Sequence, residues 1–327
     1  MEDCNMKNYI MGTNGLIFVK ERMPNCWINI EEPTSAEIQY LTQELKIPLS
    51  FLKDIEDVDE RPRIENEDDW QIIIIRIPVR SNDEKLPFIT VPLGIILKDD
   101  IIVTVCYYKS EMLSDFISYS NRKNIGFSGR YDLLLKLLLS SSVWYLKYLK
   151  QINICIKSCE KELEKSVRNQ ELQALLQIEK CFVFFITSLK GNSILLSRIK
   201  GKPGIDSDLL EDVEIEMKQA LETTNVYSDI LAGMMDAYAS VIGNNMNNIM
   251  KQLTLISIIL MIPTLIASFY GMNVPNALQD NPFGLTIIVI TSLLISSCGV
   301  LLCRYRNKKD RFFLLRIRPF FIRSFYN

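Results

Sequence analysis

The chain of 327 residues is long enough for one large domain or two ordinary ones, and it contains no histidine. The missing histidine excludes Ser-His-Asp and Cys-His nucleophiles, His-ligated zinc and haem, and histidine general-base catalysis, so we expect no enzyme. The net charge of -2 hides an uneven distribution of charge. Residues 304–327 carry eight Lys/Arg and one acid, whereas the rest of the chain has 29 basic and 38 acidic side chains. This asymmetry indicates a membrane surface or an acidic partner, not nucleic acid.

Residues 1–130 are predicted to form an α/β domain. Runs rich in Ile, Val and aromatic residues predict strands at 15–20, 26–30, 70–79, 88–98 and 101–108, with a hairpin turn at Asp99 and Asp100. Thr34 and Ser35 precede apolar residues at helical spacing and predict a helix start. The first residues show neither a signal-peptide nor a transit-peptide pattern, so we expect a domain in the cytoplasm.

From residue 131 onward the pattern is helical. Long antiparallel helices are predicted at 131–167 and 171–200, and together they form a second part of the cytoplasmic domain, residues 131–204. Gly201-Lys202-Pro203-Gly204 ends this part. No proline occurs from 206 to 262, so a helix from 206 to 270 would be about 95 Å long, at 1.5 Å per residue. Residues 205–250 of this helix are predicted to form a stalk that packs with copies of itself.

The eight cysteines include no Cys-x-x-Cys pair, but Cys155 and Cys159 share one face of the first long helix. Two readings stay open: reduced core cysteines in a cytosolic domain, or a redox or soft-metal pair.

Two uncharged runs near the C-terminal end predict transmembrane helices at 251–270 and 284–303, because about 20 apolar residues cross a bilayer. The loop 271–283 between them has no Lys or Arg, whereas Lys251 precedes the first run and the cluster 304–309 follows the second. The positive-inside rule then places both termini in the cytoplasm, the loop outside, and the protein in the plasma or inner membrane. A buried helix hairpin is the alternative.

A stripe of polar residues and methionines follows one face of the first predicted span at spacings of three and four. Its members are Asn247, Met250, Thr254, Ser257, Met261, Thr264 and Ser268. If identical helices surround an axis, this stripe lines a pore; alternatively, the hydroxyl groups bond to their own backbone in a tight helix contact. Pro263 bends the span, either as a packed kink or as a hinge for gating.

The first span ends in Tyr270-Gly271-Met272-Asn273. Gly-Met-Asn at this place, after a very long helix and before a second span and a basic tail, resembles the CorA family of magnesium transport proteins. Weaker resemblance extends over "CWINIEEPTSAEI", "FLKDIEDVDERPRIENEDDWQIIIIRI" and the stalk-to-pore segment that begins "MMDAYASVIGNN".

The resemblance implies a funnel-shaped homopentamer that passes Mg²⁺, and often Co²⁺ or Ni²⁺, without nucleotide hydrolysis and without an organic cofactor. It implies that Gly271, Met272 and Asn273 form the selectivity filter, in which Asn273 binds hydrated Mg²⁺, Gly271 allows a sharp turn and Met272 packs. Asn247 would form a second polar ring and Thr264 a ring between Met261 and the filter. The apolar constrictions would be Met250, Leu253 and Met261.

The resemblance also implies closure by cytoplasmic Mg²⁺ bound between protomers. Asp54, Asp212 and Asp236 stand at the matching positions, and a solvated acidic face is the alternative for each. Acids that face each other across an interface repel, and a divalent ion between them relieves the repulsion. The sequence departs from the family in two ways: the outer loop has one acid, Asp280, and the basic-aromatic tail 304–327 is long and is expected to lie along the membrane surface.

Two other functions remain open at this stage. One is a transporter for zinc or another divalent metal on the same scaffold; the missing histidine and Met272 disfavour it. The other is a membrane-anchored sensor or scaffold without transport activity. The polar stripe and the lack of a catalytic or nucleotide-binding motif disfavour the sensor.

Overall fold

The structure is a computed structural model that describes residues 5–12, 15–20, 23, 26–81, 83, 86–99, 101–165, 169–272, 282–299 and 301. The chain divides into two compact units, Met1–Asp236 and Ala237–Asn327. Each unit is considered by itself.

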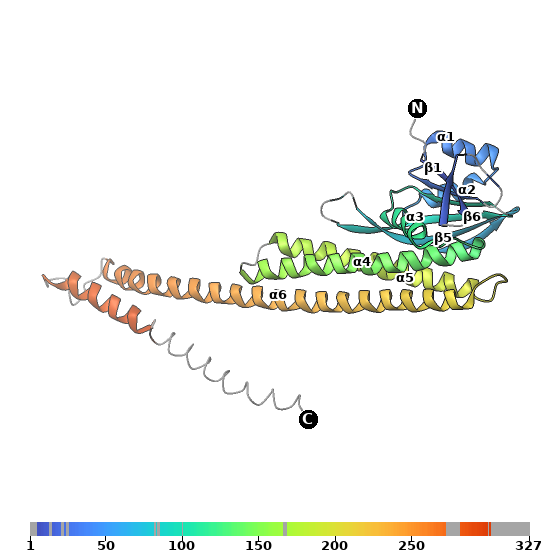
Figure 1. Ribbon diagram of the computed structural model, residues 1–327. Coiled ribbons are helices and arrows are strands. Elements are labelled where there is room, and N and C mark those ends of the chain that lie inside the picture. Colours follow the sequence, from blue (N-terminus) through green and yellow to red (C-terminus); the bar gives the residue numbers. More distant parts are fainter. Residues whose placement is uncertain are drawn as a thin grey trace, which may run out of the picture. The chain divides into compact units, whose positions relative to one another are not determined.

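A seven-stranded sheet forms the centre of the first unit (Figure 1). Its strands are β1 (Met6–Gly12), β2 (Gly15–Val19), β3 (Trp27–Glu31), β4 (Arg63–Glu67), β5 (Trp70–Arg80), β6 (Phe88–Lys98) and β7 (Ile101–Cys106). The spatial order is β2-β1-β3-β7-β6-β5-β4, and only the β3–β7 pair is parallel. The α/β class predicted for this part is therefore confirmed.

The two longest strands, β5 and β6, are buried along almost their whole length. Helices cover both faces of the sheet here, which explains why these strands read as continuous apolar runs and not as alternating ones. The predicted hairpin joins β6 to β7: Lys98 pairs with Ile101, and Asp99 adopts a left-handed φ of 46°.

Two strands were not predicted. β4 is an edge strand of mostly polar residues, and β1 mixes the buried Asn8 with exposed and half-buried residues.

One face of the sheet packs against α1 (Ser35–Gln39), the π-helical turn η1 (Tyr40–Glu44) and α2 (Leu49–Glu56). Phe51, Leu52 and Ile55 of α2 join the core that Ile72 and Ile96 of the sheet also form. The predicted helix start at Thr34 is confirmed as a capping box. The Thr34 hydroxyl accepts from the Glu37 backbone N–H, and the Glu37 carboxylate accepts from the Thr34 N–H.

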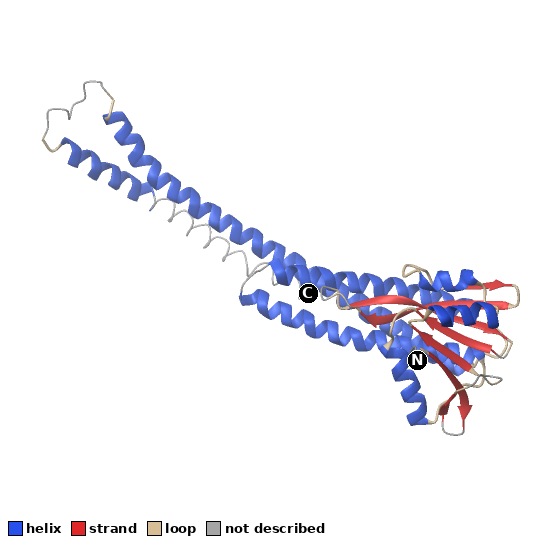
Figure 2. Ribbon diagram, turned by 90° about the horizontal axis from the view of Figure 1, so that it is seen from above, coloured by secondary structure: helices blue, strands red, loops and turns tan. Residues whose placement is uncertain are grey.

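The other face packs against α3 (Glu111–Lys123), α4 (Arg130–Lys165) and α5 (Asn169–Ile199). Trp27 of β3 contacts Phe116 of α3 edge-on, with ring centroids 5.8 Å apart. Tyr145 of α4 and Phe185 of α5 meet in the same way at 4.9 Å. Both views show α4 and α5 side by side (Figures 1 and 2). The tertiary contacts also explain why α5, which is apolar and long enough to span a membrane, belongs to the core of this unit.

The longest helix is α6 (Ser207–Tyr270), close to the predicted helix 206–270. Its part in the first unit buries a stripe at spacings of three, four and seven: Leu210, Val213, Met217, Ala220, Thr224 and Leu231. This period is typical of helix–helix packing. Its part in the second unit is apolar and exposed. A shorter apolar helix, Gly284–Gly299, follows it.

Candidate functional site

The candidate site for ion passage is the face of α6 that carries the polar stripe. Every stripe residue from Asn247 to Ser268 is exposed in the isolated chain. Four of them, Ser257, Met261, Thr264 and Ser268, line one shallow hollow of about 480 Å³. The backbone therefore brings these residues onto one face, as their spacing predicted.

The helix Gly284–Gly299 covers a different face of α6. Ile262 of α6 lies beside Gly299, since a Cβ atom built at Gly299 would be at ordinary van der Waals distance, 3.9 Å, from the Ile262 Cδ1. The partly covered residues of α6 in this stretch include Leu255, Ile259, Ile262 and Ile266, which are all apolar. The second helix thus packs on the apolar side and leaves the polar stripe open to further partners.

The stripe hydroxyl groups donate their hydrogen bonds to their own helix. Thr254 donates to the Met250 carbonyl at 2.8 Å, Ser257 to the Leu253 carbonyl at 3.0 Å, and Thr264 to the Leu260 carbonyl at 2.7 Å. Hydroxyl groups bonded to their own backbone were one of the two interpretations of the stripe. Such bonds do not make the stripe apolar. A hydroxyl oxygen that donates its single proton keeps its acceptor lone pairs. Thr254, Ser257 and Thr264 consequently present hydrogen-bond acceptors, not donors, on the open face of the stripe.

The end of α6 coincides with the Gly-Met-Asn motif. The helix ends at Tyr270, and the Gly271 N–H still donates to the Ala267 carbonyl at 2.9 Å. A Cβ atom at Gly271 would lie 3.2 Å from the same carbonyl oxygen, which is a tight approach. Asn273 lies outside the described residues, as do residues 274–281 of the outer loop and the tail 302–327.

Asp54, the first candidate regulatory carboxylate, lies on α2 and binds Arg63 at the start of β4. The distance from Asp54 Oδ2 to Arg63 Nη2 is 2.6 Å, and the two side chains are 32% and 30% exposed. Arg63 also binds Glu60 and, at 2.9 Å, Glu65. Burial by itself would lower the pKa of Arg63, but its hydrogen bonds and charge interactions with Glu60, Glu65 and Asp54 raise that pKa overall. Asp54 is therefore already paired with a positively charged side chain, that of Arg63.

Sequence reasoning did not find this role of Arg63. The residue lies in the Arg-Pro-containing segment that carries the family resemblance, nine positions after Asp54. Nothing in that spacing predicts an ion pair, because the contact depends on how α2 packs on the sheet beside β4.

The other two candidate carboxylates, Asp212 and Asp236, lie exposed on α6. Neither forms an ion pair or hydrogen bond with another residue that the structure describes. Among the described residues of the single chain, no three Asp, Glu or Cys side chains gather into a group that could hold a metal ion.

The described cysteines are all free thiols. Cys26, Cys106 and Cys181 are buried, whereas Cys155 is exposed and Cys159 is half-buried. Burial raises the pKa of Cys159, and it raises the pKa of Cys181 to about 11.

Comparison with known proteins decides the family. Residues 24–304 match the family model described as "CorA-like Mg2+ transporter protein". The chain belongs to the CorA family. It is 27% identical to the cobalt/magnesium transport protein CorA of Methanocaldococcus jannaschii over 278 residues, 82% of this chain and 86% of that protein. Identity to the CorA protein of the same name from Thermotoga maritima is also 27%, over 76% of this chain and 72% of the relative.

Solved structures support the CorA fold. The complete structure of the CorA magnesium transporter from M. jannaschii matches with a TM-score of 0.76 at 24% sequence identity, covering 93% of this chain and 98% of that one. The cytoplasmic domain of ZntB from Vibrio parahaemolyticus matches with a TM-score of 0.54 at 12% identity, over 74% of this chain and 98% of that domain. The expected α/β domain, long helices and C-terminal apolar helices are thus those of a CorA membrane protein.

Proposed function

We propose that this CorA protein is one subunit of a homopentameric, passive Mg²⁺ transport protein whose central pore is built from the second half of α6. Co²⁺ and Ni²⁺ are expected to pass as well. The observation that carries the proposal is the uncovered polar face of α6, which the helix Gly284–Gly299 leaves free and which leads directly to Gly271 and Met272.

The chemistry of this face suits a hydrated magnesium ion. Mg²⁺ gives up its six waters reluctantly, so the surface that it presents to a pore consists of water O–H groups. These groups are donors and need acceptors. Thr254, Ser257 and Thr264 supply acceptors only, because their own protons are engaged by backbone carbonyls. In a ring of subunits, such oxygens would hold the ion through its waters without removing them.

Asn273 is proposed to form the selectivity ring at the outer mouth, with Asn247 as a polar ring at the cytoplasmic end. Met250, Leu253 and Met261 are the proposed apolar constrictions, where dewetting closes a pore. The side chains of these three residues are 52%, 56% and 67% exposed in the single chain, so the neighbours of a pentamer could cover them.

Cytoplasmic Mg²⁺ is proposed to close the pore by binding between protomers at Asp54, Asp212 and Asp236. The exposure of Asp212 and Asp236 supports this proposal, since both carboxylates are available to a neighbouring chain. Both termini are proposed to lie in the cytoplasm, with residues 251–270 and 284–303 crossing the membrane.

The test is Mg²⁺ flux into vesicles that contain the purified protein, with Co²⁺ and Zn²⁺ as competitors. We expect Asn273→Ala to abolish uptake while the oligomer, measured by light scattering, stays assembled. Asn276→Ala is the matched control, because it removes the same side chain from the same loop, and it should leave uptake intact. Unchanged flux in Asn273→Ala would overturn the proposed filter.

A further inference from the structure

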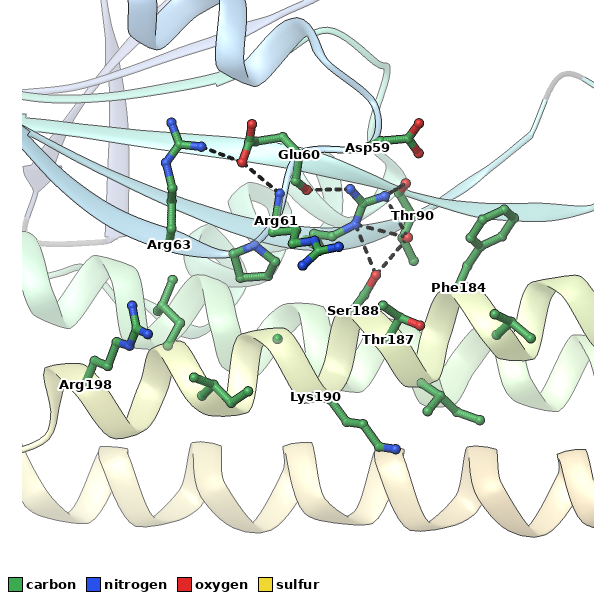
Figure 3. A pocket seen from close by; sticks show the side chains of 17 residues that line it. Asp59, Glu60, Arg61, Arg63, Thr90, Phe184, Thr187, Ser188, Lys190 and Arg198 are labelled. Atoms are coloured by element: carbon green, nitrogen blue, oxygen red, sulfur yellow. Dashed lines mark hydrogen bonds and ion pairs between the residues drawn. The ribbon is translucent and has the colours of Figure 1, made fainter.

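A cavity of about 870 Å³ lies within the first unit, and none of its lining residues belongs to α6 (Figure 3). It is bounded by residues 59–63, by Arg76 of β5 and Thr90 of β6, and by one side of α5 from Val183 to Arg198. Its volume falls in the range of about 300–1,000 Å³ that is typical of small-molecule sites.

The cavity is strongly cationic. Five basic side chains line it, Arg61, Arg63, Arg76, Lys190 and Arg198, against the two acids Asp59 and Glu60. Arg63 is already paired with Asp54, Glu60 and Glu65, and Lys190 points away from the sheet, so the excess positive charge near a ligand comes from Arg61, Arg76 and Arg198. A compound with several negative charges balances this excess better than a single carboxylate does.

Arg76 places one of these charges at the buried end of the cavity, where its side chain donates only to neutral groups. Its Nη1 donates to the carbonyls of Val58 and Glu60, each at 2.7 Å, and its Nε donates to the Ser188 hydroxyl at 3.1 Å. Its Nη2 donates to Thr90. No carboxylate of a described residue bonds to this guanidinium. Burial lowers the pKa of Arg76, whereas the charges of Asp59, Asp57 and Glu60 nearby act to raise it, so these acids already balance part of its positive charge.

Arg61 and Arg198 are the groups available to a ligand. Both are exposed, and neither side chain makes a hydrogen bond or ion pair with another residue in the described part of the chain. Figure 3 shows Arg198 rising from α5 beneath Arg63, with Arg61 further along the cavity, whereas Lys190 points away from the sheet. Each guanidinium presents a planar fork of donors that can bind phosphate oxygens in a bidentate manner.

The same wall of α5 also offers apolar surface. Val183, Phe184 and Ile194 line the cavity and are 57%, 36% and 58% exposed. Phe184 precedes Arg198 by 14 residues, about 21 Å along the helix at 1.5 Å per residue. An elongated ligand with an apolar ring at one end and negative charge at the other fits this arrangement.

We propose that this cavity binds a nucleoside polyphosphate, with the phosphates held between Arg61 and Arg198 and the base on the apolar side chains of α5. Arg63 lines the cavity and also binds Asp54, so the bound anion would alter the charge around the carboxylate proposed as regulatory. The binding itself does not depend on transport.

The test is isothermal titration of the purified full-length protein with ATP in the presence of EDTA, compared with adenosine and with inorganic phosphate. We expect ATP to bind at least tenfold more tightly than either fragment. Arg61→Gln and Arg198→Gln should each weaken ATP binding about tenfold, since each removes a charged fork. Arg61→Lys, which keeps the charge but not the fork, should fall between Arg61→Gln and the unaltered protein.

Lys200→Gln is the matched control. Lys200 follows α5 closely, pairs with Glu214 at 2.9 Å and does not line the cavity, so its loss should leave ATP binding unchanged. Circular dichroism and light scattering establish that each variant is folded and assembled. The proposal fails if ATP does not bind, if adenosine binds equally well, or if Lys200→Gln weakens binding as much as Arg61→Gln does. It also fails if Arg61→Gln and Arg198→Gln dissociate the oligomer and ATP does not change the oligomeric state. The cavity would then be a contact between subunits.

Discussion

Arg63 is expected to set the Mg²⁺ concentration at which the pore closes. Its guanidinium lies 2.6 Å from the Asp54 carboxylate, so Arg63 competes with a metal ion for the charge of that carboxylate. Arg63→Gln keeps much of the size and the hydrogen-bonding capacity of the side chain and removes its charge. Asp54 is then free to bind Mg²⁺ without first losing a partner.

The size of the effect follows from the exposure of the pair. Both side chains are about one-third exposed, and an ion pair of this kind contributes about 1 kcal/mol. This free energy corresponds to a factor of about five in an equilibrium constant. The Mg²⁺ concentration for half-maximal closure should therefore fall about fivefold in Arg63→Gln.

The assay is Mg²⁺ flux in vesicles at a series of Mg²⁺ concentrations on the cytoplasmic side. Arg80→Gln is the control, since it makes the same substitution in an arginine that pairs with another acid, Glu111 at 3.4 Å, and not with Asp54. Asp54→Asn should weaken the response to Mg²⁺, and adding Arg63→Gln to it should have no further effect. A half-maximal concentration that is unchanged or higher in Arg63→Gln would refute the competition between Arg63 and Mg²⁺.

Three further predictions concern the first unit. Gly94→Ala should lower the free energy of unfolding by about 1–3 kcal/mol in denaturant titration, because the new Cβ would overlap the Ile55 side chain. Adding Ile55→Val to Gly94→Ala should recover part of this loss, with an m-value like that of the unaltered protein. Arg76→Met should lower the free energy of unfolding by about 3 kcal/mol, since it leaves buried carbonyl and hydroxyl acceptors without their donor. An unfolding midpoint close to that of the unaltered protein would contradict this role of the Arg76 hydrogen bonds. Maleimide at pH 8 should modify the exposed Cys155 but not Cys106 until the protein unfolds, because burial raises the pKa of the Cys106 thiol to about 12; peptide mass mapping reads the result.

The sequence by itself determined the features that depend on local periodicity and composition. Strands β5 and β6, the capping box at Thr34 and the long helix α6 all follow from patterns within one segment. The polar stripe also follows, since residues three and four apart share one face of any α-helix. The CorA family was predicted differently, from the resemblance of the Gly-Met-Asn motif and its place after a very long helix, and comparison then confirmed it.

The tertiary structure decided what depends on contacts between distant segments. Strand β4 could not be predicted because its mostly polar residues show no strand pattern, and only pairing with β5 makes them part of the sheet. The packing of Gly284–Gly299 on the apolar side of α6 determined which face of that helix stays open. Arg63 meets Asp54, and Arg61 and Arg198 line one cavity, only because α2, β4 and α5 pack around the sheet. Such juxtapositions carry no period in the sequence, since packing and not local propensity brings the residues together.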